Sequence, residues 1–216
     1  MNYTTIKAAS EARGLCIAAA FHPEPDDLPP EGCRTLILLA PHEPGFWARI
    51  EKEPCGENPV DDWSRREVTA LANQIDAKPL FPFGGPPYQP FIRWALASGQ
   101  VWQSPLGLLV HHQQGLFISF RGALAFERDI DLPTQTSTSP CLTCPDQPCK
   151  LACPVDAFAQ GSYNVPTCTS HLATPEGQDC LQSGCIARRA CPVSQGWPRN
   201  PRQSAHHMRI FFASNR

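Results

Sequence analysis

Eleven cysteines occur in the 216-residue chain, and eight of them lie between positions 141 and 191. These eight are Cys141, Cys144, Cys149, Cys153, Cys168, Cys180, Cys185 and Cys191. The first four form the pattern C-x2-C-x4-C-x3-C-P, and the last three form C-x4-C-x5-C-P. Thiolate sulfur is a soft ligand that suits iron–sulfur clusters, zinc and copper(I). The segment is therefore a candidate metal centre with these eight cysteines as ligands.

Both runs end in Cys-Pro-Val, at Cys153 and at Cys191, which indicates a diverged internal duplication. Bacterial ferredoxins carry a similar run, C-x2-C-x2-C-x3-C-P, whose fourth cysteine binds the other cluster of a two-cluster protein. Each 4Fe-4S cluster is bound by four thiolates, so eight cysteines supply two complete sets. We therefore expect two 4Fe-4S clusters as cofactors.

Three alternatives stay open for this segment. Structural zinc also favours C-x2-C spacing and tetrahedral thiolates. Zinc sites usually have two C-x2-C pairs or include histidine, whereas this sequence has only one C-x2-C pair. A single cluster would leave spare thiols. Disulfide bonds would need an oxidising compartment, and we expect that the protein is not directed to one.

Outside this segment, the residues that could bind a ligand are isolated in the sequence. Cys16 stands in an apolar run and is interpreted as a small core residue. Arg121 interrupts an apolar strand, where it either forms an ion pair within the domain or meets an anionic cofactor. No role is assigned to the remaining cysteines and to four histidines, namely Cys33, Cys55, His111, His112, His206 and His207.

Composition and charge exclude some classes of protein. Apolar residues make up 42% of the chain, enough for a core, and 24 prolines favour irregular connections over a helical bundle. Residues 141–216 carry seven Lys and Arg against four Asp and Glu, while residues 1–140 carry eleven against sixteen. The C-terminal arginines can compensate the negative charge of thiolate-bound clusters. A nucleic-acid-binding face would be far more basic, so we expect no nucleic-acid partner.

No apolar run approaches the roughly 18 to 20 residues of a membrane span. The first residues, MNYTT, lack a basic region followed by a long apolar stretch. We therefore expect no membrane association and a cytoplasmic location.

The elements that must position these residues begin with a sheet domain over residues 1–128. Continuous apolar runs predict strands, and apolar residues at helical spacing predict helices. We expect helices at 3–13, 45–50, 61–75 and 91–97, and buried strands at 14–21 and 34–40. Asp61 or Asp62 is placed to cap the third helix. Residues 107–111 and 116–126 are predicted to form a hairpin around Gly115.

Residues 129–140 are mostly polar and mark a linker into the cysteine-rich part at 141–216. That part has few apolar residues, so bound metal is expected to hold it together.

The cysteine-rich part resembles the iron–sulfur half of epoxyqueuosine reductase. The shared features are the C-x2-C run, the Cys-Pro endings, the lone Cys168, and the final Gly184-Cys185. The resemblance implies a small ferredoxin-like dicluster domain. It also implies two ligand sets: Cys141, Cys144, Cys149 and Cys191 for one cluster, and Cys153, Cys168, Cys180 and Cys185 for the other.

Residues 34–50, the helix at 61–75 and above all residues 104–126, SPLGLLVHHQQGLFISFRGALAF, resemble the cobalamin-processing CblC proteins. This resemblance implies an α+β, nitroreductase-like sheet domain and a corrinoid as a further cofactor.

Three functions follow from these observations. The first is an iron–sulfur redox protein that passes single electrons to a cofactor or a partner protein on the sheet domain, with Arg188 and Arg189 raising the cluster potential. The second is a corrinoid-binding or corrinoid-reducing protein. The third is a structural metal-binding module without redox activity. Whether the chain is itself an oxidoreductase or the electron-transfer part of one stays open.

Overall fold

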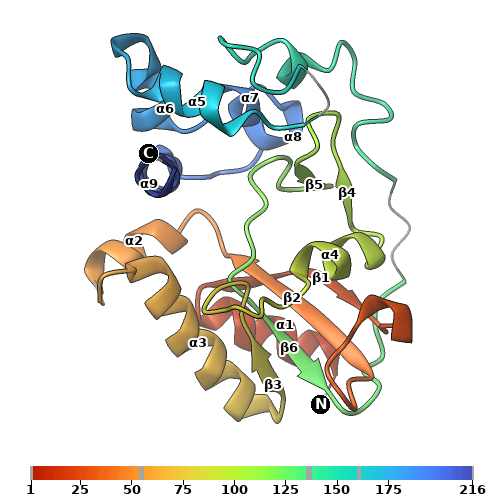
Figure 1. Cartoon of the computed structure of the whole chain (residues 1–216). Coiled ribbons are helices and arrows are strands. Elements are labelled where there is room, and N and C mark those ends of the chain that lie inside the picture. The colour runs from red at the N-terminus through yellow and green to blue at the C-terminus, as the bar shows by residue number, and fades with distance from the viewer. Residues whose placement is uncertain (1, 54–55, 135–137, 160–161, 216) are drawn as a thin grey trace. The chain divides into compact units, whose positions relative to one another are not determined.

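The computed structural model describes residues 2–53, 56–134, 138–159 and 162–215 (Figure 1). The chain divides into two compact units. Unit 1 comprises Met1–Val101 and Ser119–Ser137, and unit 2 comprises Trp102–Ile118 and Thr138–Arg216. Residues 102–118, expected in the sheet domain, belong to the cysteine-rich unit, and the expected linker at 129–140 is divided between the two units.

Unit 1 is built on an antiparallel sheet. Among the described residues its strands are ordered β1 (Leu15–Phe21), β2 (Thr35–Pro41), β6 (Gly122–Phe126) and β3 (Lys78–Leu80). Every residue of β2 is buried. Its continuous apolar run predicted this central position, since a strand covered on both faces has no need of polar alternation.

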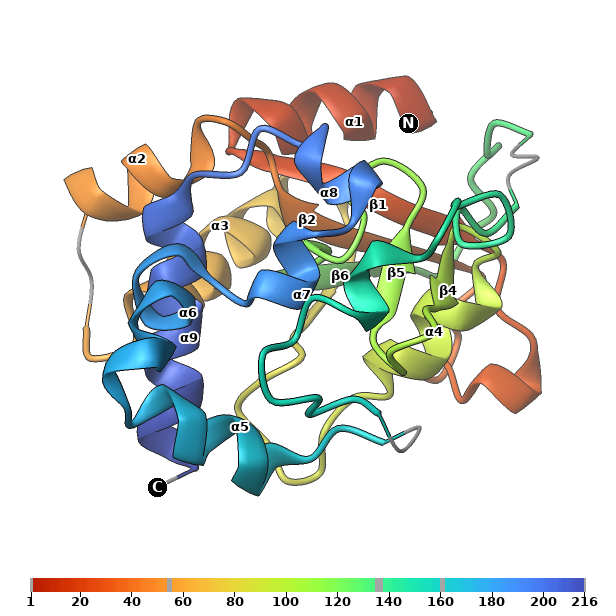
Figure 2. The same ribbon diagram turned by 90° about the horizontal axis from the view of Figure 1, so that it is seen from above.

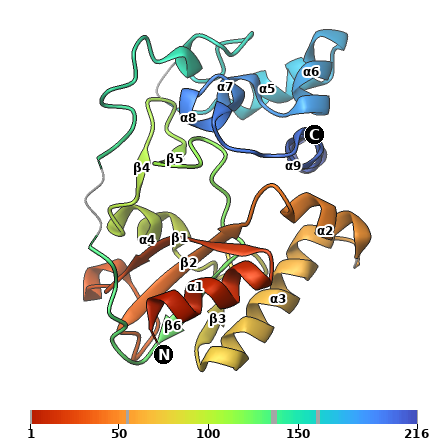
Figure 3. The same ribbon diagram turned by 180° about the vertical axis from the view of Figure 1, so that it is seen from behind.

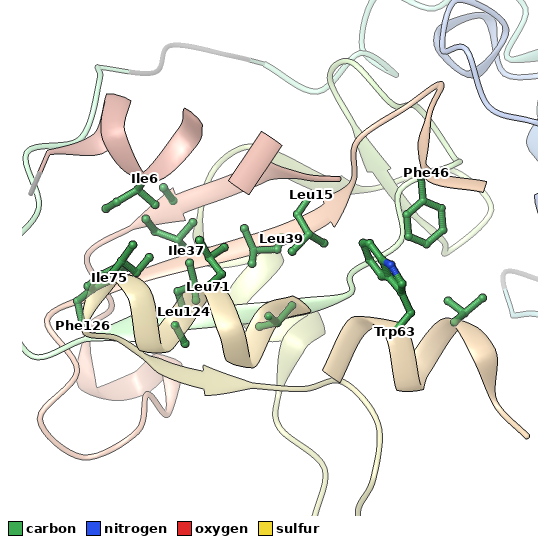
Figure 4. Packing of buried hydrophobic residues seen from close by; sticks show 14 of the residues in the cluster. Ile6, Leu15, Ile37, Leu39, Phe46, Trp63, Leu71, Ile75, Leu124 and Phe126 are labelled. Carbon is green, nitrogen blue, oxygen red and sulfur yellow. The ribbon is translucent and has the colours of Figure 1, made fainter. Parts of the chain in front are cut away.

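Helices cover the sheet of unit 1 and supply its core. They are α1 (Tyr3–Ala12), the 3-10 turn η1 (Pro25–Asp27), α2 (Phe46–Lys52), α3 (Pro59–Ile75) and α4 (Phe91–Ala97). Ile37 and Leu39 are two residues apart on β2, so both side chains face the same side of the sheet. They pack with Leu71 of α3 and Ile6 of α1, and all four side chains are fully buried (Figures 3 and 4).

The predicted cap of α3 is wrong. The helix begins at Pro59 after Asn58, so Asp61 and Asp62 lie inside the first turn. In that position a carboxylate interacts favourably with the positive end of the helix dipole without capping it. Proline is favoured at the first helical position because it lacks the amide hydrogen that would be unpaired there.

Unit 2 consists of a small two-stranded sheet and short helices. Its elements are β4 (Val101–Gln103), β5 (Leu109–His111), η2 (Pro148–Lys150), α5 (Val165–Leu172), η3 (Pro175–Gly177), α6 (Gln178–Ser183), α7 (Ile186–Arg189), α8 (Pro192–Gln195) and α9 (Pro201–Ser214). Helix α6 lies beside α9 (Figure 2). No helix in the described part of the chain combines the length and apolar character of a membrane span.

The predicted hairpin between residues 107–111 and 116–126 is wrong. Strand β5 pairs with β4 in unit 2, whereas β6 pairs with β2 and β3 in unit 1. Gly115 does reverse the chain, but through a single bridge with His111. Short apolar runs show that a segment is buried without showing which strand it pairs with.

Candidate metal centre

The eight clustered cysteines all belong to unit 2 and are carried by loops and short helices. Cys141 lies in a turn, Cys144 and Cys153 lie in irregular segments, and Cys149 lies in η2. Cys168 and Cys180 are on α5 and α6. Cys185 and Cys191 directly precede α7 and α8, where each is the N-cap residue. Proline follows Cys191 at the first helical position, where its fixed φ starts the helix.

One group of four thiols surrounds a cavity of about 190 Å³. The cavity is lined by Cys141, Cys144, Cys149 and Cys191, with apolar wall residues that include Val110 and Leu116. An apolar protein cavity of about 150 Å³ takes up a benzene molecule, so this space admits a compact inorganic group. Four thiolates are also the number of ligands that an iron–sulfur cluster takes.

The wall of this cavity comes partly from residues 102–118, which the sequence had placed elsewhere. The Leu116 backbone N–H donates to Ser194 Oγ at 2.9 Å, and Arg188 Nη1 donates to the Leu116 carbonyl at 2.7 Å. Gly115 has φ +58°, and a Cβ atom there would lie 2.5 Å from the Ser194 nitrogen. These contacts fix the segment against α8 directly after Cys191, which explains why it belongs to unit 2.

The other four thiols form a second group near Tyr163. Cys168 is close enough to Cys153 and Cys185 for their charges to affect its pKa, and Cys180 is in turn close to Cys168 and Cys185. Tyr163 lies close enough to Cys168 to lower the pKa of that thiol, although burial raises it more. Its ring stacks on Phe158, with centroids 4.7 Å apart. The Ala157 N–H donates to Cys153 Sγ at 3.4 Å. Hydrogen bonds to sulfur are one of the ways in which proteins tune iron–sulfur potentials.

The two groups have the same members as the two ligand sets that the resemblance implies. In the first group, Cys149 lies near Cys141, Cys144 and Cys191, and their negative charges raise its pKa. Cys191 therefore joins three cysteines from much earlier in the chain, although it shares its sequence run with Cys180 and Cys185. The grouping comes from the fold and not from proximity in sequence.

Burial raises the pKa of the Cys141, Cys149, Cys168 and Cys180 thiols, and the neighbouring cysteines raise them further. Several buried thiolates close together repel one another, so without metal these side chains keep their protons. A metal bound here must displace those protons and neutralise the thiolate charge, which couples metal binding to the folding of this unit.

No three His, Cys, Asp or Glu residues among those described are gathered closely enough to hold a single metal ion. A zinc site needs its sulfur atoms about 2.3 Å from one point. The thiols are arranged around a larger space, at least in the first group.

The two arginines expected to tune the clusters differ in their surroundings. Arg188 lies close enough to Tyr163 to lower its pKa, although burial and Cys168 raise that pKa more. The Arg188 charge is therefore near the second cysteine group. Arg189 donates to the Gly184 carbonyl and forms an ion pair with Asp179 at 2.5 Å. Arg189 thus already has an acidic partner, whereas no ion pair is seen for Arg188 among the described residues.

Other residues singled out in the sequence lie elsewhere. Cys16 is on β1, where its thiol donates to the Pro41 carbonyl, and Cys33 donates to the Thr35 carbonyl. Cys55 lies outside the described residues. His111 is buried and accepts backbone N–H bonds at Nδ1 from Gln113 and Gln114, so its role is structural. Tyr163 and Ser194 were missed, because neither stands in a recognisable spacing pattern with the cysteines.

Comparison with known proteins gives a likeness in fold alone. The sequence matches no family model and no curated protein. The structure is similar to that of epoxyqueuosine reductase from Streptococcus thermophilus, with a TM-score of 0.56 and 17% identity over 94% of this chain and 70% of that one. A selenomethionine-labelled epoxyqueuosine reductase gives a TM-score of 0.51 at 13% identity, covering 94% and 71% of the two chains.

An epoxyqueuosine reductase bound to an epoxyqueuosine-modified stem loop of tRNA-Tyr gives a TM-score of 0.50 at 13% identity, covering 93% of this chain and 69% of that one. Identities this low leave residue roles undetermined. The likeness extends over nearly all of this chain, including both the sheet and the cysteine-rich part. The chain therefore has the fold of epoxyqueuosine reductase.

Proposed function

We propose that the protein is an iron–sulfur redox protein that binds two 4Fe-4S clusters, one in each group of four cysteines. The observation that carries this proposal is the gathering of eight thiols into two separate sets, one of them around an apolar cavity. The likeness in fold to epoxyqueuosine reductase supports it, since the cysteine-rich part is included in the match. On this proposal unit 2 is a ferredoxin-like dicluster domain.

The residues of unit 2 fit such clusters in number and in chemistry. Each set supplies the four thiolates that a cluster takes, and no thiol of the segment is left over. Bound clusters would supply one-electron redox chemistry at low potential. Val110 and Leu116 exclude water from one side of the first set, and in the second set the Ala157 amide donates to Cys153 and Tyr163 lies near Cys168. Burial, donors to sulfur and the charge of Arg188 together set the potential.

Iron content after anaerobic reconstitution tests the proposal. We expect about eight iron atoms per chain and a reduced-state EPR signal. Cys33→Ser is the matched control, because Cys33 is a partly buried thiol of unit 1, and it should keep the full iron content. Reconstituted wild-type protein with fewer than about four iron atoms per chain would overturn the proposal.

Double variants test how the cysteines are divided. Replacing Cys141 and Cys149 together with serine removes two ligands from one set and should leave about four iron atoms. Replacing Cys149 and Cys168 together removes one ligand from each set and should lose nearly all iron. Equal iron contents in the two double variants would contradict the grouping.

A second candidate function is corrinoid binding or corrinoid reduction by unit 1. It is favoured by the antiparallel sheet with covering helices, which a CblC-like or nitroreductase-like domain would have, and by the likeness of residues 34–50, 61–75 and above all 104–126 to CblC proteins. Cobalamin should then change its visible spectrum on titration with the protein and raise the melting temperature. An unchanged spectrum and an unchanged melting temperature would reject this function.

A structural metal module is the third candidate, and its metal would have no accessible redox change. Voltammetry of the reconstituted protein separates it from the first proposal. A reversible one-electron couple supports electron transfer, whereas protein that takes up zinc, stays colourless and shows no couple supports a structural role.

A further inference from the structure

Unit 1 contains an open hollow of about 570 Å³ that is independent of the cysteines. Its lining includes Asp61, Phe83, Tyr88, Phe91, Phe120 and Arg121. Small-molecule sites in proteins are typically concave, mostly apolar and provided with a few convergent polar groups. The hollow has this character, because aromatic side chains surround one guanidinium and one carboxylate.

Arg121 is the charged group in the wall of this hollow. It stands directly before β6, and its backbone N–H donates to the Leu39 carbonyl at 2.8 Å, which ties it to β2. The side chain is 11% exposed. The guanidinium is thus held at the end of a buried strand, with little freedom to move into solvent.

The protein compensates this buried charge incompletely. Arg121 Nη1 contacts Asp61 Oδ1 at 3.4 Å, and Nη2 donates to Ser119 Oγ at 3.0 Å. Charge-assisted hydrogen bonds are normally about 2.7 to 2.9 Å long, so the contact with Asp61 is weak. The buried Nε atom has no hydrogen-bond partner among the described residues.

Burial lowers the pKa of Arg121, and Asp61 offsets only part of that effect. Burying a cation is costly unless hydrogen bonds and an opposite charge compensate it. Asp61 is 41% exposed, so solvent screens its charge. Arg121 can therefore bind an anion in addition to its present partners. The planar guanidinium can donate two parallel hydrogen bonds to a carboxylate or a phosphate.

The aromatic side chains define the rest of the ligand. The Phe91 ring lies 6.1 Å from that of Phe120, the residue next to Arg121. The Arg65 guanidinium lies over the Phe83 ring, 5.3 Å from its centroid, which adds a second positive charge near this wall. Tyr88 is 66% exposed, an unusual exposure for a large aromatic residue. These walls offer flat apolar surface beside the cation.

We propose that this hollow binds a small anionic molecule with a flat ring, whose carboxylate or phosphate pairs with Arg121 while the ring packs against Phe83, Phe120 and Tyr88. The site belongs to unit 1 and does not depend on cluster binding. Its test is therefore independent of the test of the proposed redox function.

Titration of the full chain with fluorinated probes, followed by 19F NMR line widths, tests the site. The probes are 4-fluorobenzoate, which has the ring and the charge, 4-fluorobenzamide, which has the ring without the charge, and trifluoroacetate, which has the charge without the ring. We expect 4-fluorobenzoate to bind at least about ten-fold more tightly than 4-fluorobenzamide, because a hydrogen bond to a charged group contributes roughly that much. We expect a similar advantage over trifluoroacetate, because burying the apolar ring contributes about as much.

Arg121→Gln should weaken 4-fluorobenzoate binding by a similar factor, and Tyr88→Ala should weaken it several-fold. Arg34→Gln is the control, since Arg34 is an exposed arginine of unit 1 paired with Asp129 outside the hollow. The comparison of probes on wild-type protein needs no variant, so it holds even where Arg121→Gln fails to fold. Absence of 4-fluorobenzoate binding, equal binding of the neutral amide, or unchanged binding by folded Arg121→Gln overturns the proposal.

Discussion

A methyl group added at Gly115 is expected to detach residues 102–118 from the cysteine-rich unit. Gly115 has φ +58°, which costs an L-residue roughly 1 to 2 kcal/mol. The new Cβ would also lie 2.5 Å from the Ser194 nitrogen and 2.6 Å from its Oγ. Because one of these atoms is backbone, the clash cannot be relieved by turning a side chain, and overpacking of this kind costs roughly 1 to 3 kcal/mol.

Moving the chain away would also break the hydrogen bond from the Leu116 N–H to Ser194 Oγ, which contributes about 1 kcal/mol. Gly107→Ala is the matched control in the same segment. Its φ is +75°, but the nearest atom to its Cβ would be Gln103 Nε2 at 3.9 Å, an ordinary contact. Both alanine variants have the free-energy cost of a positive φ, so this cost cancels in the comparison. The clash and the lost hydrogen bond remain, and Gly115→Ala should be about 2 to 4 kcal/mol less stable than Gly107→Ala.

Urea unfolding of the two variants under identical anaerobic conditions measures this difference, followed by far-UV circular dichroism. Leu116 lines the cavity of the first cysteine group, so Gly115→Ala should also release iron faster to a chelator. If the two variants have the same free energy of unfolding within about 0.5 kcal/mol, the packing of Gly115 against Ser194 does not hold this segment in place.

Three further outcomes are expected. Trp63→Ala should destabilise unit 1 by about 3 to 5 kcal/mol in urea unfolding, because Trp63 is 2% exposed and its ring meets Phe46 edge-on at 5.1 Å; a loss below about 1 kcal/mol would contradict this packing. Asn164→Ala removes the acceptor for the Thr167 N–H at the start of α5 and should cost about 1 kcal/mol, with Cys168 held less firmly and iron lost faster to a chelator than from wild type. Removing the metal should increase hydrogen exchange across residues 141–195 and leave β1 and β2 protected, because the apolar cluster of unit 2 includes the cysteines themselves, whereas unit 1 has a separate core; equal loss of protection in both units would show that metal does not specifically support unit 2.

Several elements could be predicted because their signals are local. Apolar residues at helical spacing located α3 to within two residues at its start and at its end. The continuous apolar run at 34–40 predicted a buried central strand, and β2 is one. Such patterns depend only on residues close in sequence and on the face on which each side chain lies. They therefore predict an element without knowledge of the element that packs against it.

The segment at 104–126 shows where this reasoning fails. Its apolar residues indicated burial correctly, since Val110, Leu116 and Leu124 are all buried. Their division between two units was not predictable, because a short apolar run does not specify the surface that it covers. The contacts that decide it, from Leu116 to Ser194 and Arg188, join residues far apart in the chain.

The sequence by itself determined the chemistry of this protein: eight cysteines with ferredoxin-like spacing, whose side chains are suited to binding metal. The grouping of Cys191 with Cys141, Cys144 and Cys149 was implied by the family resemblance, whereas the cavity that these thiols line and the burial of Arg121 beside an aromatic hollow were decided by tertiary structure alone. The physical reason is that the donor atoms of a side chain are fixed by its residue type, whereas its neighbours are fixed by long-range packing that brings distant parts of the chain together.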